Sequence, residues 1–324
     1  MLSCDAWLQT ILRDRPIVGQ MTTVCILPLY HVFAFVNASL IAASKGGHCL
    51  LIPDARNTSL TIRALKGRHF HSFSGVNTLF NALTEHPGFA TLDFAELRMS
   101  VGGGMEVSSA TAQRWFEVTG CPIAEGYGLT ETTSGICCNR LDLDAFTGTL
   151  GLPMPGAEIR ILDPGGQQTP FGIPGAICVR GATIMDGYWN QPDATREVMT
   201  EDGFFRTGDL GSMDEDGFIT FLGRQKDVIV VSGFMVYPRE IEDVVKEMDG
   251  ITDCAAVGAP DPKTGESIWL FVVASEAKKN EIEQKCQQSL AAYKKPAQIV
   301  FLDSLPMIGP GKINRNALRS LAAQ

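Results

Sequence analysis

The sequence predicts an α/β protein in three parts: a parallel sheet of βαβ units, a small antiparallel unit, and a small α+β domain at the C-terminal end. Three observations predict this. Short apolar runs alternate with helical patterns up to Val101, which is typical of parallel βαβ units. From Thr147 onward, glycine, proline and short β-branched runs dominate, which favours a twisted, barrel-like antiparallel unit. Residues 225–324 return to alternating strand and helix patterns.

Length and charge divide the chain. At 324 residues it exceeds the size at which one hydrophobic core stops growing, so we expect two domains, 1–223 and 224–324. The net charge is −9, but residues 225–324 are nearly balanced, with 12 basic and 13 acidic residues. At the expected boundary between the two domains, residues 223–227 place Arg and Lys just before a β-branched run. This pattern suits a hinge that moves charged groups into and out of a cleft.

Composition also excludes some classes of protein. There is no basic patch, so nucleic-acid binding is not expected. No apolar run reaches the ~18 residues of a membrane span, and residues 1–30 do not read as a signal peptide. The nine cysteines contain no CxxC pair, which predicts free thiols in a reducing cytoplasm. Cys137 and Cys138 suit either a reactive pair or the commoner fate of inert burial.

The first part is expected to contain alternating strands and helices. A strand over 24–29 precedes a helix over 32–44 that Gly46 and Gly47 end. The other expected elements are strand 49–52, helix 59–68, strand 72–75, helix 77–83 and strand 97–101. In parallel sheets, ligands bind beyond the carboxyl ends of strands. Three features fall at such ends: His31, Gly102-Gly103-Gly104, and Gly126-Tyr127-Gly128.

The first two of these features are ambiguous. His31 suits a packed histidine in an aromatic turn as well as a ligand-facing side chain. The three glycines suit a turn, or a close approach of a ligand to backbone without Cβ atoms. A helix expected to open near Val107 and Ser108 would direct its positive dipole end to the same place.

The segment 125–133 is more informative. Two glycines flank Tyr127, whose ring can stack on a base. Thr130 offers a hydroxyl to a phosphate, and Glu131 offers a hard oxygen to Mg²⁺. The same two residue types also suit a helix start, so both interpretations stay open.

The second and third parts each contain one candidate residue. Strands are expected over 158–162, 176–179 and 217–221. Asp209 follows a glycine turn and suits either both hydroxyls of a ribose or an Asx turn. The C-terminal part is expected to contain helix 238–248, strands 254–257 and 269–273, helix 281–291, strand 299–301 and then a loop. Lys312 follows Gly-Pro-Gly in that loop and suits either a cleft or the surface.

Five motifs in one order make a more specific signal than any of them alone. They are YGLTE (127–131), GYWNQPDAT (187–195), RTGDL (206–210), GRQKDVIVVSG (223–233) and GKINR (311–315). In residues and spacing this set resembles the adenylate-forming enzymes, which include acyl-CoA synthetases, the adenylation domains of peptide synthetases and firefly luciferase. Segments 27–33, 75–83 and 233–238 are similar to bacterial long-chain fatty acid:CoA ligases. The resemblance covers essentially the whole chain and implies the adenylate-forming enzyme fold.

The resemblance implies a two-step reaction. A fatty acid carboxylate attacks the α-phosphate of ATP to give acyl-AMP and pyrophosphate, and the CoA thiolate then displaces AMP after the small domain rotates. It implies that Thr130 contacts phosphate and Glu131 holds Mg²⁺, and that Asp209 and Arg224 hold the ribose. It also implies that the adenine is framed by Gly104, Met105, Glu106, Glu125, Gly126, Tyr127 and Gly128.

The remaining implied roles concern the acid, CoA and the hinge. Lys312 bridges carboxylate and phosphate in the first step, Lys226 is the hinge residue, and Gly233 lies where a side chain would block pantetheine. The residues implied to line the acyl pocket are His31, Val76, Gly102 and Gly103.

One family element has no counterpart in this sequence. The phosphate loop, a Ser/Thr/Gly-rich segment ending in Pro-Lys-Gly or similar, would lie just upstream of His31, and residues 1–30 do not contain it. We therefore expect an N-terminally truncated chain with weak or no activity, and a partner chain carrying the missing N-terminal half would complement it. Two alternatives stay open: an aryl or medium-chain acid as substrate, and a non-catalytic nucleotide-binding remnant. Peripheral membrane contact is compatible with long-chain substrates.

Overall fold

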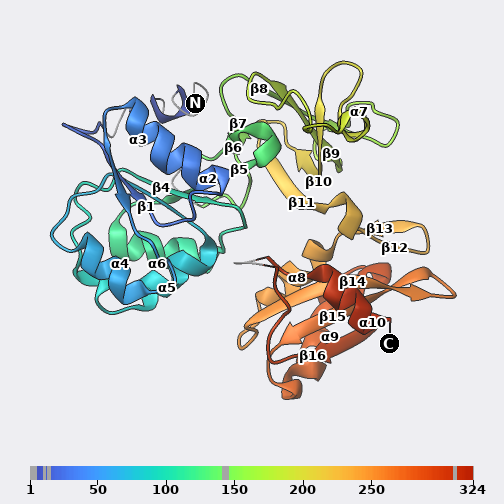
Figure 1. Cartoon of the computed structure of the whole chain (residues 1–324). Helices are drawn as coiled ribbons and strands as arrows, with labels where there is room; N and C mark the ends of the chain where they lie inside the picture. Colours follow the sequence, from blue (N-terminus) through green and yellow to red (C-terminus); the bar gives the residue numbers. More distant parts are fainter. Residues whose placement is uncertain (1–5, 10–11, 13–15, 141–145, 309–311, 324) are drawn as a thin grey trace. The chain divides into compact units, whose positions relative to one another are not determined.

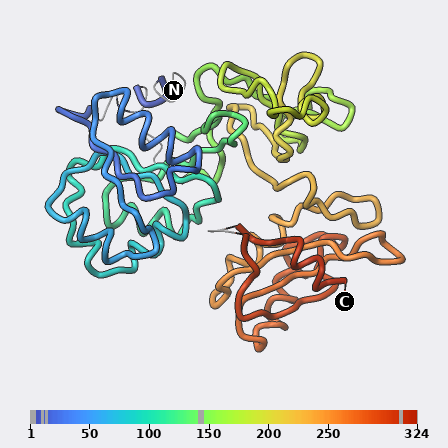
Figure 2. The backbone as a smooth tube through the Cα atoms, viewed as in Figure 1, coloured from blue at the N-terminus to red at the C-terminus, as the bar shows by residue number. Residues whose placement is uncertain are grey.

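The computed structural model forms two compact units, shown in Figures 1 and 2. Residues 6–9, 12, 16–140, 146–308 and 312–323 are described. Unit 1 comprises Met1–Thr207 and Ser212–Phe221, and unit 2 comprises Gly208–Gly211 and Leu222–Gln324. The domain boundary expected between residues 223 and 224 stays a prediction.

A seven-stranded sheet in the order β2-β1-β3-β4-β5-β6-β7 organises unit 1 (Figure 1). The pairs among its first five strands are parallel, which confirms the expected βαβ units. The antiparallel pairing of β6 with β5 and β7 was not predicted. The bounds are β1 Thr22–Cys25, β2 His48–Leu51, β3 Ser72–Gly75, β4 Met99–Gly103, β5 Ile123–Leu129, β6 Ser134–Cys138 and β7 Leu152–Pro153.

Helices cover both faces of this sheet. One face carries α4, α5 and α6, and its core contains Phe73, Phe80 and Trp115 in mutual ring contact. The other face carries the helical segment α2–η1–α3, which packs against Met99 and Val101. The helix bounds are α2 Val32–Ala34, η1 Phe35–Leu40, α3 Ile41–Ser44, α4 Thr58–Leu65, α5 Asn77–Glu85, η2 Phe89–Thr91, α6 Ser109–Thr119 and η3 Thr130–Thr132.

The helical segment after β1 differs from the expected one in its hydrogen bonding. A single helix over 32–44 was predicted, and the segment is indeed helical throughout, but η1 is a π-helix. The strand expected over 24–29 ends at Cys25, ahead of Pro28, which has no backbone N–H to donate to a sheet. The apolar run therefore predicted the strand but not the point at which it ends.

A second, four-stranded sheet follows in the order β11-β10-β9-β8. Its pair β8–β9 is antiparallel, as the glycine-rich and proline-rich texture predicted. Ile159, Ile177 and Ile219 contribute to its core. The bounds are β8 Ala157–Leu162, β9 Gly175–Gly181, α7 Pro192–Val198, β10 Phe205–Met213 and β11 Ile219–Arg224.

Unit 2 is an α+β body whose sheet has the order β13-β12-β15-β14, with β16 pairing β15. The long hairpin β14–β15 supplies much of its core, including Ala256, Leu270 and Val272. Helix α10, which Asn314 caps by accepting from Ala317 N, was not predicted. The bounds are η4 Gln225–Asp227, β12 Ile229–Val231, β13 Phe234–Val236, α8 Pro238–Lys246, β14 Asp253–Asp261, β15 Gly265–Val273, η5 Glu276–Lys278, α9 Lys279–Ser289, η6 Ala292–Lys294, β16 Gln298–Phe301 and α10 Arg315–Ala322.

Eight of the cysteines lie in the described part of the chain, and all eight are free thiols. Cys137 and Cys138 are both buried, as the second interpretation expected, and burial raises the pKa of the Cys137 thiol well above its ordinary value. Within the described ranges, no helix is both long enough and apolar enough to cross a bilayer.

Candidate functional site

The loop after β4 is held in place by a buried carboxylate. Glu125 on β5 is 7% exposed, and its Oε1 accepts a 2.9 Å hydrogen bond from the backbone N–H of Val107. Asn77 Oδ1 accepts from Ser108 N at 3.0 Å. Helix α6 then begins with Ser108 as its N-cap, which confirms the helix start expected there. The Glu125 side chain therefore shapes the backbone of the glycine loop.

The three consecutive glycines face different surroundings. A Cβ on Gly102 would lie 2.5 Å from Val107 Cγ2, in the core on the α6 side of the sheet. A Cβ on Gly103 would lie 3.3 Å from the ring of Phe33, on the opposite side. Successive strand residues point to opposite faces, so Gly102 and Gly103 cannot line the same cavity. Gly104 has φ +76°, a left-handed conformation that favours glycine.

The turn between β5 and β6 is tightly built. A Cβ on Gly128 would lie only 1.6 Å from Ser134 O, so any side chain there would force the backbone of the turn to shift. Thr132 is buried, and its hydroxyl accepts from Leu129 N at 2.9 Å and donates to Ser134 O at 2.8 Å. Thr133 and Ser134 both have positive φ. The turn thereby exposes Thr130 and leaves Glu131 half-buried.

A second segment of unit 1 holds Glu131. Tyr188 Oη donates a 3.0 Å hydrogen bond to Glu131 Oε1, and Met185 N donates to Glu131 O at 2.8 Å. Burial, and then the hydrogen bond to Glu131, raise the pKa of the Tyr188 phenol. The backbone N–H of Tyr188 is fixed in turn by Thr195 Oγ1 at 2.9 Å. Tyr188 lies in the predicted motif 187–195, but its role was not predictable, because a contact across 57 positions leaves no local signal.

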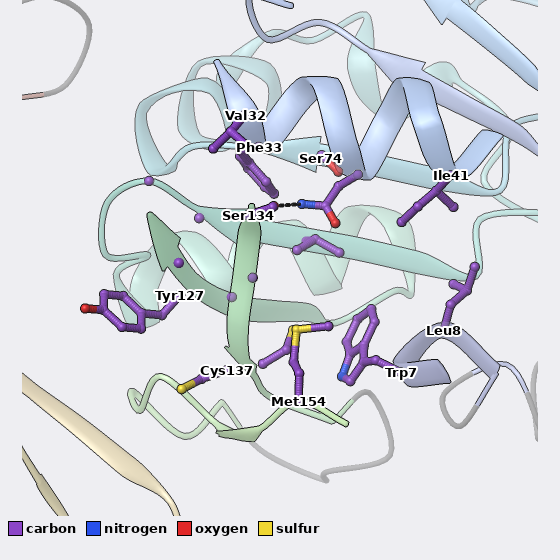
Figure 3. Close-up of a pocket in the computed structure, with 18 of the residues that line it drawn as sticks. Trp7, Leu8, Val32, Phe33, Ile41, Ser74, Tyr127, Ser134, Cys137 and Met154 are labelled. Carbon is purple, nitrogen blue, oxygen red and sulfur yellow. Dashed lines mark hydrogen bonds between the residues drawn. The ribbon is translucent and has the colours of Figure 1, made fainter. Parts of the chain in front are cut away.

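A cavity opens beside this turn, between the sheet and the segment α2–η1–α3 (Figure 3). The space within it that a water-sized sphere can occupy is about 60 Å³, and its walls are mainly apolar. Val32, Phe33 and Tyr127 lie toward one end in Figure 3, and Trp7 and Leu8 lie toward the other. Six predicted site residues line it: His31, Gly103, Gly104, Gly126, Tyr127 and Gly128.

The other predicted residues of unit 1 do not line this cavity. Val76 and Gly102 belong to, or pack against, the core on the α6 side. Met105 and Glu106 lie in the loop before α6. His31 lines the cavity and also caps α2, because its Nδ1 accepts from Phe33 N at 3.2 Å. His31 is exposed, so the packed interpretation is wrong, and the ligand-facing interpretation stays a prediction.

The candidate ribose-binding pair lies in unit 2. Asp209 is 3% exposed, and one of its carboxylate oxygens lies 3.4 Å from Arg224 Nε. Their strands β10 and β11 are neighbours in the four-stranded sheet, which brings together residues that are distant in sequence. A buried carboxylate beside a half-exposed guanidinium offers an acceptor and a donor to one polar ligand.

The segment expected to act as a hinge is attached to α10. Lys226 has an exposed side chain, but its backbone oxygen accepts from Arg319 at 3.2 Å. Asp227 forms a 2.7 Å ion pair with Arg319. The backbone of Lys226 and the side chain of Asp227 are therefore attached to α10 within unit 2.

Arg315 of the GKINR motif is a structural residue in this arrangement. Its guanidinium donates to both carboxylate oxygens of Glu242, at 2.7 and 3.1 Å, and to Ala256 O at 2.7 Å. Burial alone disfavours its charge, but Glu242 and Asp227 raise its pKa above the ordinary value. The GKINR motif alone did not distinguish this structural role of Arg315 from the role expected for Lys312.

The last two candidates lie on exposed turns. Gly233 has φ +83° and Ser232 has φ +51° in the two-residue turn of the β12–β13 hairpin, and nothing lies within 4 Å of a Cβ built on Gly233. Lys312 is exposed, and its backbone oxygen accepts from Ile308 N at 2.6 Å. The Gly-Pro-Gly turn at 309–311 lies outside the described residues. No group of three potential metal-binding side chains occurs among the described residues.

Comparisons with known proteins agree with this architecture. The AMP-binding enzyme family matches residues 1–189, and the AMP-binding enzyme C-terminal domain matches residues 240–312. A long-chain-fatty-acid–CoA ligase of Escherichia coli is 42% identical over 306 residues, covering 94% of this chain and 54% of the relative. A feruloyl-CoA synthase of an Amycolatopsis species is 31% identical, covering 95% of this chain and 63% of the relative. The chain thus spans about half the length of the long-chain ligases it matches.

Solved structures of related enzymes share this fold. The crystal structure of ATP-bound MatB from Rhodopseudomonas palustris superposes with a TM-score of 0.88 at 29% identity, covering 99% of this chain and 63% of that one. The o-succinylbenzoate CoA synthetase of Bacillus subtilis, with its acyl-adenylate, superposes with a TM-score of 0.84 at 26% identity, covering 98% and 64%. The expected adenylate-forming fold is confirmed, and the chain belongs to the AMP-binding enzyme family.

Proposed function

We propose that this chain contributes to an ATP-dependent, AMP-forming acid:CoA ligase that acts on long-chain fatty acids. In that reaction a carboxylate oxygen attacks the α-phosphorus of ATP, pyrophosphate leaves, and CoA sulfur then displaces AMP from the acyl carbon. The observation that carries the proposal is the mainly apolar cavity beside the turn that displays Thr130 and Glu131. An apolar chain and a phosphate-bearing group could bind there as neighbours.

The acid is proposed to occupy this cavity, with its carboxylate toward Tyr127. His31 and Gly103 line the wall, and the absence of a Cβ on Gly103 leaves room beside the Phe33 ring. Burial of an alkyl chain against such walls contributes about 0.8 kcal/mol per methylene. Val76 and Gly102, which do not line the cavity, stay predictions of the family resemblance.

The nucleotide is proposed to bind at the glycine loop and the 125–131 turn. Tyr127 and the backbone of 104–106 and 125–128 would frame the adenine, and Thr130 would donate to a phosphate. Asp209 and Arg224 of unit 2 would hold the ribose. Glu131 fits a magnesium ligand, because it is half-buried and Tyr188 engages only its Oε1. Bound Mg²⁺ would neutralise phosphate charge.

Unit 2 is proposed to serve the two half-reactions in turn. Lys312 would place a cation between carboxylate and phosphate in the first, since two anions must approach each other there. The open turn at Gly233 would admit pantetheine in the second. Lys226 would lie at the pivot, with the domains dividing between residues 223 and 224. Exchange of faces by rotation lets one cleft serve two reactions.

A second candidate substrate class is an aryl acid. It is favoured by the 31% identity to feruloyl-CoA synthase and by the 28% identity to the anthranilate CoA ligase AuaEII. The ring of Tyr127, which contacts that of Phe221, and the ring of Phe33 offer aromatic contacts to such a substrate.

Binding is the appropriate test, because the 324 residues contain no Ser/Thr/Gly-rich phosphate loop. We expect little acyl-CoA formation by this chain alone, since positioning of the leaving pyrophosphate can supply several kcal/mol of the barrier. An acyl-AMP mimic lacks the β- and γ-phosphates, so its binding avoids that requirement.

The experiment titrates oleoyl- and feruloyl-sulfamoyladenosine into the purified chain by calorimetry. We expect the oleoyl mimic to bind more tightly, and Asp209→Asn to weaken its binding about tenfold. Asp216→Asn, at an exposed position in the β10–β11 turn, should leave the affinity unchanged. Tighter binding of the feruloyl mimic would favour the aryl acid, and failure of both mimics to bind would contradict the proposed function.

A further inference from the structure

One polar side chain faces the cavity without a hydrogen-bond partner. Ser74 on β3 is 3% exposed, and its Oγ makes no hydrogen bond in the described part of the chain, although the residue lines the cavity. A buried hydroxyl without a partner is unfavourable, and the great majority of such groups in native proteins are satisfied. A group that enters the cavity is therefore the natural partner for Ser74.

A second polar group belongs to the helical segment across the cavity. Asn37 on the π-helix η1 lines the cavity, and its Nδ2 donates a 2.9 Å hydrogen bond to Ser134 Oγ (Figure 3). Asn37 Oδ1 accepts no hydrogen bond from any residue in the described ranges. Single π-helical turns are frequent at functional sites. Ser74 thus offers a donor and an acceptor, and Asn37 offers a further acceptor.

Strand register places Ser74 midway along the cavity. Ser74 pairs with Val101 on β4, between Met99 and Gly103, and all three of these β4 residues line the cavity. At about 3.4 Å per strand residue, Ser74 lies about 7 Å from the level of Gly103 and about 7 Å from that of Met99. The polar group is therefore not at the mouth, where the carboxylate is proposed to lie.

The cavity continues as an apolar space beyond Ser74. Leu8, Ile41 and Met99 line this part, and each belongs to the hydrophobic core under the α2–η1–α3 segment. A ligand that reaches them needs an apolar tail, whereas a ligand that passes Ser74 needs a hydrogen-bonding atom in its middle. An unsubstituted alkyl chain would leave the Ser74 hydroxyl without a hydrogen-bond partner and out of contact with water.

We propose that the cavity selects carboxylic acids whose chain carries a hydroxyl or carbonyl oxygen midway along its length. The hydroxyl of Ser74 and the carboxamide of Asn37 would bind that oxygen, and the apolar end of the cavity would take the tail. The inference rests on the proposed function, because it assumes that the acyl chain occupies this cavity. It goes beyond that function by naming a substrate class and two specificity-determining residues.

The test measures binding of free acids to the purified 324-residue chain by calorimetry. The probes are dodecanoate, its 5-, 6- and 7-hydroxy derivatives, and 12-hydroxydodecanoate. We expect at least one mid-chain hydroxy acid to bind about tenfold more tightly than dodecanoate, because only it satisfies the buried hydroxyl. The 12-hydroxy acid should bind no better than dodecanoate, since it places its oxygen in the apolar end.

Two substitutions and one control substitution localise the effect. Ser74→Ala should abolish the preference while retaining dodecanoate binding. Ser72→Ala is the matched control, because Ser72 lies on the same strand and face, is fully buried, and also lacks a partner, but does not line the cavity. It should retain the preference. Asn37→Leu should reduce it, with thermal melting as the check on folding.

The outcomes separate this inference from the proposed function. Equal binding of dodecanoate and every hydroxy acid would overturn the inference alone, and would indicate that a water molecule satisfies Ser74. A preference that survives Ser74→Ala would overturn the assignment of the residue. If acyl-adenylate mimics bind but none of the free acids competes with them, the cavity is not the acyl site, and the inference fails while the ligase proposal stands.

Discussion

Tyr188 and Glu131 lie 57 positions apart in the chain and are joined by a 3.0 Å hydrogen bond from phenol to carboxylate. The bond engages one carboxylate oxygen and so fixes the direction in which the other points. Under the proposed role of Glu131 as a magnesium ligand, Tyr188 would act as a positioning residue. Such outer partners typically affect metal affinity by 10- to 100-fold.

In any form of the protein that binds ATP, Tyr188→Phe should therefore raise the magnesium concentration needed for half-maximal ATP binding by about tenfold. The matched control is Tyr30→Phe, because Tyr30 is 88% exposed. The pKa of the Tyr188 phenol lies above the ordinary 10.0, so the phenol keeps its proton from about pH 7 to 9 and can donate throughout that range. Titration of Tyr188 should therefore not change the magnesium requirement over this range. An unchanged magnesium titration in Tyr188→Phe would remove the positioning role.

Gly128→Ala should destabilise unit 1 by about 3 kcal/mol, near the upper end for overpacking, because its Cβ would lie 1.6 Å from Ser134 O. Gly126→Ala, on the same strand, is the control. Its Cβ would lie 3.6 Å from Cys138 Sγ, an ordinary contact, and should cost less than about 1 kcal/mol. Urea unfolding of both variants measures the difference, and equal midpoints would show that the turn relaxes.

Arg315→Met should cost about 3–5 kcal/mol in the free energy of unfolding of unit 2, since it leaves the Glu242 carboxylate buried without its cation. Adding Glu242→Gln should recover part of this loss, because the remaining amide is neutral. Lys285→Met removes a surface pair with Glu247 and should cost no more than about 1 kcal/mol. Denaturant unfolding decides the matter, and similar losses for Arg315→Met and Lys285→Met would refute the structural role.

Lys312→Ala should impair the two half-reactions unequally in any form of the protein that carries out both. Formation of acyl-AMP should lose about 3–4 kcal/mol of transition-state stabilisation, by analogy with loss of one oxyanion-hole donor. Conversion of supplied acyl-AMP and CoA should be spared. Pyrophosphate release and CoA consumption measure the two steps, with the exposed Lys263→Ala as control. Equal losses in both steps would argue against the assignment.

Gly233→Leu should do the opposite, slowing CoA consumption while acyl-AMP accumulates. The left-handed φ of +83° at Gly233 introduces a second effect, since a leucine there also strains the hairpin. Gly233→Asn separates the two, because asparagine tolerates this conformation with a smaller side chain. If Asn and Leu variants consume CoA equally slowly, strain rather than obstruction is the cause.

The parallel strands of unit 1 were predictable because their signal is local. A buried parallel strand is a short apolar run, and the glycines and prolines between runs mark its limits. β3 was predicted with its observed bounds. The π-helical bonding of η1 was not predictable, since the apolar pattern over 32–44 suits either helix and the choice depends on packing against the sheet.

The site was predictable as a set of motifs but not as a geometry. Gly102 and Gly103 are indistinguishable in sequence, and only the position of β4 between two helical layers sends them to different faces. Likewise, Arg315 and Lys312 share one motif, yet Arg315 is committed to Glu242 while the Lys312 side chain is exposed.

The sequence by itself therefore determined the family, the order of the elements and the residue types available for chemistry, because these depend on local patterns and ordered motifs. Only the tertiary structure decided which side chains line a common cavity and which are engaged in contacts within the protein core. The contact of Tyr188 with Glu131 and the unpaired hydroxyl of Ser74 both depend on segments distant in the chain. Strand register and helix packing bring such segments together, and no local pattern encodes the resulting distance between two side chains.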